Sequence, residues 1–116
     1  MKTAIVGSRS LSENCYSSLE RYVPKGTSEI ISGGAEGIDS LAERYAQEHG
    51  LAMTVIRPDY KLYDRHAPLI RNSEICNSAD YVLILWDGIS RGSMNVIMTC
   101  IKQNKPFRVL LVEEKF

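Results

Sequence analysis

Several features that mark common classes of protein are missing from this sequence of 116 residues. Its 14 basic and 14 acidic residues cancel, so no excess positive charge would draw the whole chain to nucleic acid or to a membrane surface. No apolar run approaches the length of a membrane span, and the run that follows Lys2 is too short for a signal peptide. We therefore expect no membrane partner.

Cysteine and histidine are scarce. The cysteines Cys15, Cys76 and Cys100 are far apart and form no C-x-x-C pair, which favours reduced, buried thiols over a disulfide framework. His49 and His66 stand at no metal-binding spacing with each other or with the cysteines. We predict a cytoplasmic protein with no metal site and no resident cofactor.

Three familiar site signatures are also absent. The chain has no G-x-G-x-x-G, no G-x-x-x-x-G-K-[ST] and no H-E-x-x-H, so neither a dinucleotide fingerprint, nor a Walker A loop, nor a zincin site is supported. What the chain does have is the stretch I-I-S-G-G-A-E-G-I-D at residues 30–39. Glycines allow close approach to the backbone, and a helix N-terminus offers unpaired N–H groups. The stretch predicts either a phosphate-binding loop or simply a tight strand-to-helix turn.

Apolar runs alternate with helical periodicity along the chain. Strands are predicted at 2–6, about 28–32, 51–56, 80–86 and 106–112, with helices ending at Pro24, over about 39–50, over about 67–78 and over about 94–104. Because the strands are almost continuously apolar, both faces of the sheet should be covered. We predict one α/β domain over 1–116, with a doubly wound, five-stranded parallel sheet in the order 3-2-1-4-5 and helices on both faces.

Local signals refine these boundaries. Ser10 with Glu13, and Ser40 with Glu43, have the spacing of capping boxes. Residues 57–65 read as a polar loop.

The predicted strand order places the ligand site at the carboxyl ends of the strands, where the chain reverses direction. Loops 7–10, 32–39 and 87–93 meet there. Six basic residues also fall on or beside that edge: Arg9, Arg57, Lys61, Arg65, Arg71 and Arg91. A cationic rim suits a phosphorylated ligand, although a solvated basic surface has the same pattern.

Two residues end the most apolar strand. Trp86 would either stack on a base or close the core. Asp87 would act as a general base, accept a hydrogen bond from a ribose hydroxyl, or cap the following turn.

Three blocks, taken together, resemble the SLOG superfamily of Rossmann-like domains, which includes the DNA-processing Smf proteins and the LOG phosphoribohydrolases. The blocks are I-V-G-S-R at 5–9, S-G-G-A-E-G-I-D at 32–39, and I-R-N at 70–72 followed by W-D-G-I-S-R-G-S at 86–93. The set looks most like small stand-alone bacterial and phage SLOG proteins. Glu36 stands where Smf proteins often carry a basic residue, which favours a small ligand over DNA.

The resemblance implies that the protein binds a nucleotide or a nucleotide-derived molecule through its glycine loops. The alternatives are an enzyme that hydrolyses the N-glycosidic bond of a nucleoside monophosphate, with Asp87 as the catalytic group, and a module that binds single-stranded nucleic acid. A homo-oligomer is compatible with all three. The expected ligand-binding residues are Gly7, Ser8, Arg9, Ser32, Gly33, Gly34, Gly37, Asp39, Arg71, Asn72, Trp86, Gly88, Ser90, Gly92 and Ser93.

Overall fold

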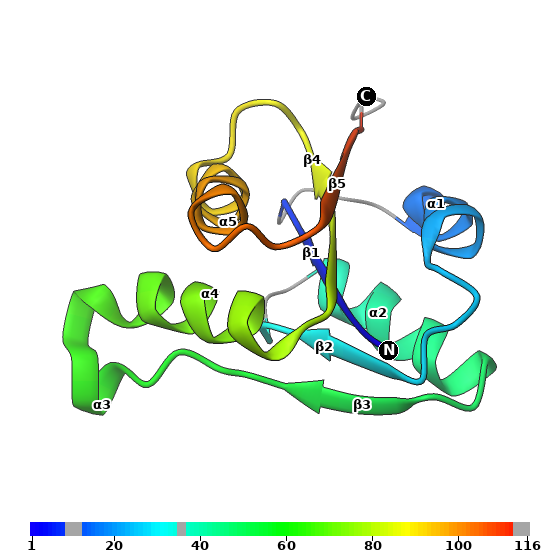
Figure 1. Ribbon diagram of the computed structural model, residues 1–116, viewed down its shortest axis with the longest axis horizontal. Coiled ribbons are helices and arrows are strands. Elements are labelled where there is room, and N and C mark those ends of the chain that lie inside the picture. Colours follow the sequence, from blue (N-terminus) through cyan, green and yellow to red (C-terminus); the bar gives the residue numbers. More distant parts are fainter. Residues whose placement is uncertain (9–12, 35–36, 113–116) are drawn as a thin grey trace.

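The computed structural model describes residues 1–8, 13–34 and 37–112. Five parallel strands form one sheet in the order β3-β2-β1-β4-β5 (Figure 1). The strands are β1 (Lys2–Gly7), β2 (Glu29–Ser32), β3 (Ala52–Val55), β4 (Tyr81–Trp86) and β5 (Phe107–Leu111). The predicted Rossmann-like fold and strand order are confirmed.

Strand β4 has neighbours on both sides and apolar residues on both faces. Leu83 and Leu85 join one buried cluster, whereas Val82 and Ile84 join another. All four side chains are fully buried. This burial explains why the sequence here shows a continuous apolar run in place of alternation.

Helices cover the two faces in pairs (Figure 1). Helices α1 (Tyr16–Tyr22) and α2 (Ile38–Glu48) supply Leu19 and Leu41 to the cluster that contains Leu83. Helices α4 (Ala67–Ser78) and α5 (Arg91–Lys102) supply Ile75 and Val96 to the cluster that contains Ile84. The core therefore lies in two layers, one on each side of the sheet.

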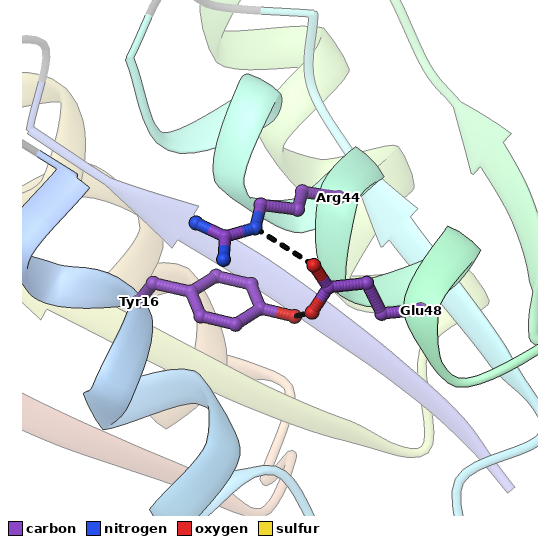
Figure 2. A network of polar contacts seen from close by, with 3 residues as sticks. All are labelled: Tyr16, Arg44 and Glu48. Carbon is purple, nitrogen blue, oxygen red and sulfur yellow. Dashed lines mark hydrogen bonds and ion pairs between the residues drawn. The ribbon is translucent and has the colours of Figure 1, made fainter.

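A polar contact ties α1 to α2 (Figure 2). The Tyr16 hydroxyl donates to Oε2 of Glu48 at 2.5 Å, and Nε of Arg44 donates to Oε1 of the same carboxylate at 3.0 Å. The Arg44 guanidinium also lies 4.0 Å from the centroid of the Tyr16 ring. Tyr16 itself is buried, so this contact satisfies its hydroxyl group at the edge of the core.

Two details of the helices differ from the prediction. Helix α2 begins at Ile38 after Gly37, whose φ is 80°, so the chain enters the helix before Ser40 and the predicted Ser40–Glu43 capping box is wrong. Residues 57–65 are not wholly loop, because they contain the short helix α3 (Tyr60–Tyr63) and the start of the 3-10 turn η2 (Asp64–His66). The Asp59 side chain starts α3 by accepting from the Leu62 amide.

The region before α1 is only partly covered by the structure. A 3-10 turn, η1 (Glu13–Cys15), precedes that helix. Ser10 and the side chain of Glu13 lie outside the described part of the chain, so the capping box expected there stays a prediction.

Of the four apolar residues whose spacing marks α5 in the sequence, only Ile97 packs against the core, where it is partly buried. Met94, Met98 and Ile101 are 40%, 46% and 56% exposed, whereas Val96 and Cys100 are buried. Cys76 of α4 lies against Cys100, with 3.6 Å between the two sulfur atoms, and both thiols are free. Among the helices that the structure describes, none is both long and apolar enough to cross a membrane.

Candidate functional site

A pocket of about 390 Å³ opens at the carboxyl ends of β1, β2 and β4, at the predicted edge of the sheet. Ten of the residues expected at a site line it together: Gly7, Ser8, Gly33, Asp39, Arg71, Asn72, Asp87, Ser90, Gly92 and Ser93. They come from the three loops that meet at the switch point and from α4. The pocket thus brings together segments more than 80 residues apart.

Three serine hydroxyls form a hydrogen-bonded row in this pocket. The Ser8 hydroxyl accepts from the Asp87 amide at 3.1 Å and donates to Ser90 at 3.2 Å, and the Ser90 hydroxyl donates to Ser93 at 3.1 Å. Each hydroxyl has one proton and two lone pairs, so in this order every serine accepts one hydrogen bond and donates the next. The Ser93 proton is left for an acceptor, so the row ends in a donor.

The row ends at the N-terminus of α5. Gly92 and Ser93 lie in the first turn of this helix, which contains no acidic residue. The unpaired N–H groups of a first helical turn and the helix dipole attract anions. A hydroxyl donor and backbone donors therefore converge at this end of the pocket.

Arg71 connects α4 to the glycine loop. Its Nη1 donates to the Gly33 carbonyl and its Nε donates to Oδ1 of Asn72 at 2.9 Å. Asn72 is buried and donates to Oδ1 of Asn95 on α5, also at 2.9 Å. These contacts explain why α4 has a weak apolar stripe: part of its buried face is polar and holds Arg71 at the pocket.

Asp87 caps the turn that leads into α5. Its Oδ1 accepts from the amides of Ile89 and Ser90 at 2.9 and 2.8 Å. Those two hydrogen bonds hold the pKa of Asp87 below its usual range. A carboxylate held ionised in this way is poorly suited to proton transfer near neutral pH.

The same turn contains the sequence G-x-S-x-G at residues 88–92, a spacing typical of the strained nucleophile elbow of serine hydrolases. Ser90 nevertheless has an ordinary extended backbone, with φ of −67° and ψ of 131°. Its hydroxyl bonds to other serines, and neither His49 nor His66 lines the pocket. The geometry does not make Ser90 an activated nucleophile.

A family model described as "YspA, cpYpsA-related SLOG family" matches residues 1–63, just over half of the chain. The chain belongs to this SLOG family. Among solved structures, it is similar to DNA processing protein A (DprA) from Streptococcus pneumoniae, with a TM-score of 0.76 and 19% identity. That match covers 93% of this chain and 49% of DprA, so the chain spans about half the length of that structure. No curated protein matches the sequence significantly.

The double glycine of the SLOG loop lies against two arginines. An added Cβ would come within 2.7 Å of Nη1 of Arg71 at Gly33, and within 2.7 Å of Nη1 of Arg57 at Gly34. Gly34 also has a φ of 77°. The glycines therefore leave room for the two guanidinium groups as well as for the turn.

Asp39 lies in the first turn of α2, within the SLOG block. It lines the main pocket and also a smaller one of about 240 Å³ that contains Ser32 and Gly34. Burial raises the pKa of Asp39 to about 6, although the Ser32 hydroxyl, the Gly33 backbone and the guanidinium groups of Arg71 and Arg57 oppose the shift. Asp39, and not Asp87, is thus the pocket carboxyl group that titrates near neutral pH.

Five predicted residues lie outside the lining of the main pocket. Ser32 and Gly34 line only the smaller pocket, and Gly37 precedes α2. Trp86 packs against the core, and its indole N–H donates to the Ser90 carbonyl at 3.0 Å. Gly88 is exposed in the turn, with φ of 87°. Arg9 lies outside the described residues.

The apolar part of the lining was not predicted from the sequence; it consists of Val6, Ile38, Pro68, Leu69 and Val96. Val6, Ile38 and Val96 follow the ordinary periodicity of strands and helices, so no sequence signal separates them from core residues. Leu69, at 50% exposed, is the partial exception, because an exposed leucine beside an expected site residue is consistent with a ligand contact.

Proposed function

We propose that this SLOG protein binds a nucleotide or nucleotide-derived ligand in the main pocket. The observation that carries the proposal is the convergence of the Ser8–Ser90–Ser93 hydroxyl row and the first turn of α5 on one end of the pocket. Hydroxyl and amide donors together suit a phosphate group. The phosphate would therefore bind at α5, not at the loop of residues 33–37.

The residues at the opposite end of the pocket suit the sugar and base of a nucleotide. The Arg71 guanidinium lies beside Gly33, and Asp39 places a negative charge at the start of α2, which offsets the dipole of that helix. The Asp39 carboxylate disfavours a phosphate there, whereas the charge of Asp87 at the other end is partly offset by the Ile89 and Ser90 amides. Pro68 and Leu69 provide apolar surface on the wall from α4, as is common in pockets that bind small molecules.

A substitution at Gly92 tests this assignment. A Cβ at Gly92 meets no atom within 4 Å, so Gly92→Asp should fold, and the added carboxylate should stabilise the start of α5 while repelling a phosphate. We expect nucleoside 5′-monophosphates to raise the thermal unfolding temperature of the wild type and to bind the variant at least tenfold more weakly. The binding constants can be measured by isothermal titration calorimetry.

Gly26→Asp is the matched control, because it adds the same charge at the opposite edge of the sheet, where a Cβ also meets no atom within 4 Å. It should bind nucleotides as the wild type does. Equal weakening in both variants, or no binding of any nucleotide by the wild type, would contradict the proposal.

The enzymatic alternative predicts a further product in the same titrations. An N-glycosidic hydrolase would release free base from a nucleoside monophosphate, whereas a binding protein would return the nucleotide unchanged. Asp39 favours this second candidate, since a carboxyl group with a pKa of about 6 is better placed for acid–base chemistry than Asp87. Chromatography of the titrated samples separates the two functions.

A further inference from the structure

Two buried oxygen atoms beside the glycine loop make no well-formed hydrogen bond to any residue that the structure describes. Oγ of Ser32 and Oδ2 of Asp39 are both buried, and neither meets a partner with full hydrogen-bond geometry among those residues, although the Ser32 hydroxyl and the Gly33 backbone lie close enough to lower the pKa of Asp39. Ser32 is 0% exposed. Buried polar groups are nearly always paired, because leaving one unpaired costs free energy. Two such atoms on adjacent elements suggest a polar group that arrives with a ligand.

Two arginines that act on Asp39 also donate hydrogen bonds to the backbone of the glycine loop. Nη1 of Arg71 donates to the Gly33 carbonyl, and Nη1 of Arg57 donates to the Gly34 carbonyl at 3.5 Å. Both guanidinium groups still act on Asp39 through space. They therefore lower the cost of the buried carboxylate without occupying its Oδ2.

The missing partner must be a hydrogen-bond donor. An ionised carboxylate only accepts, and it repels phosphate, so the ligand group at Asp39 is neutral or positive and carries N–H or O–H. In a nucleotide whose phosphate lies at α5, the ribose comes next. Its 2′- and 3′-hydroxyls are two adjacent donors, which match the two oxygens of one carboxylate.

Asp87 is a weaker candidate for this role, although it lines the same pocket. Its Oδ1 already accepts from the Ile89 and Ser90 amides, and it lies in the turn at the phosphate end. A ribose hydroxyl there would compete with both hydrogen bonds that hold the turn.

We propose that Asp39, supported by Ser32, accepts hydrogen bonds from the vicinal ribose hydroxyls and makes the pocket selective for ribonucleotides over 2′-deoxyribonucleotides. The inference rests on the proposed function, since it concerns the same pocket. It assigns to Asp39 a specificity role that the sequence suggested for Asp87.

The test compares ribo and 2′-deoxy forms of the same 5′-monophosphates, with adenine, guanine and cytosine as bases. Calorimetric titration of the wild type should show about tenfold or tighter binding of the ribo form, as expected for a hydrogen bond to a charged group. Asp39→Asn keeps the shape and removes the charge, and it should reduce the ratio of the two affinities to near one. Glu20→Gln removes the same charge from an exposed position on α1 and should leave the ratio unchanged.

A second measurement needs no variant. Because both ligands carry the same phosphate, its titration cancels in the ratio of their affinities. The ratio in the wild type should fall as the pH drops below about 6, where Asp39 gains a proton. Among the residues that the structure describes, Arg57 and Arg71 are the charged groups that act on Asp39, and both keep their charge throughout this range.

Each outcome decides one of the two proposals. Tight but equal binding of the ribo and deoxy forms, or a preference that survives Asp39→Asn, would overturn the role of Asp39 while leaving nucleotide binding intact. Failure of every nucleotide to bind would overturn the proposed function itself.

Discussion

Asp39 and Asp87 line one pocket, yet their surroundings give them opposite acid–base behaviour. Backbone amides hold the pKa of Asp87 low, whereas burial raises that of Asp39 to about 6. The sequence suggested Asp87 as the reactive carboxylate because it follows the most apolar strand. A sequence does not show which carboxylate accepts hydrogen bonds from the amides of a turn and which is desolvated, because both depend on the atoms that surround the carboxylate in the fold.

The raised pKa of Asp39 has a consequence for stability. Its folded pKa of about 6 lies above the ordinary value of 3.8, so the folded protein binds this proton more tightly than the unfolded chain does. The ionised carboxylate therefore lowers the free energy of unfolding above pH 6, and this penalty disappears as the pH falls from 6 towards 3.8.

We accordingly expect Asp39→Asn to be more stable than the wild type at pH 8, by about 1–2 kcal/mol, an estimate reduced for the partial exposure of the residue. The difference should shrink through pH 6 and vanish near pH 4. Urea unfolding followed by Trp86 fluorescence measures it, with Glu20→Gln as the control. A variant less stable than the wild type at pH 8 would show that the carboxylate supports the fold.

At the scale of elements, three glycines differ in two properties, namely a positive φ and the crowding that an added Cβ would meet. Gly34 has a positive φ and lies against Arg57, Gly50 has a positive φ of 64° in open space, and Gly26 has neither constraint. Alanine at the three positions therefore separates backbone strain from crowding.

We expect Gly26→Ala to unfold like the wild type, and Gly50→Ala to lose about 1 kcal/mol from strain in the left-handed region. Gly34→Ala should lose more than Gly50→Ala, because it must also displace Arg57. Urea denaturation of the three variants measures the order. Equal losses at Gly34 and Gly50 would mean that Arg57 moves aside without cost.

Element boundaries show what local sequence signals can and cannot predict. The 67–78 helix was predicted to its end residues, because Ala67 and Pro68 mark a first turn that needs no tertiary contact. The start of α2 was wrong, since the positive φ of Gly37 overrides the capping signal of Ser40. Likewise, the exposed stripe on α5 has helical periodicity, but periodicity alone does not say which face the sheet buries.

At the scale of the whole molecule, the parallel sheet assembles the pocket. The predicted strand order placed the loops after β1, β2 and β4 at one edge of the sheet, and ten of the expected residues line one pocket there. The strand order did not predict how the side chains inside the pocket contact one another. The serine row and the unpaired Asp39 oxygen depend on side-chain geometry between segments distant in sequence.

The most direct test of the account is a ¹⁵N–¹H NMR titration of the wild type with the four ribonucleoside 5′-monophosphates. A phosphate bound at the first turn of α5 should shift the amide signals of Gly92 and Ser93 most strongly, and a ribose at the other end should shift that of Gly33. The account predicts this pattern for at least one nucleotide. Shifts centred on Gly34 and Gly37 that spare α5, or no shifts with any of the four, would contradict it.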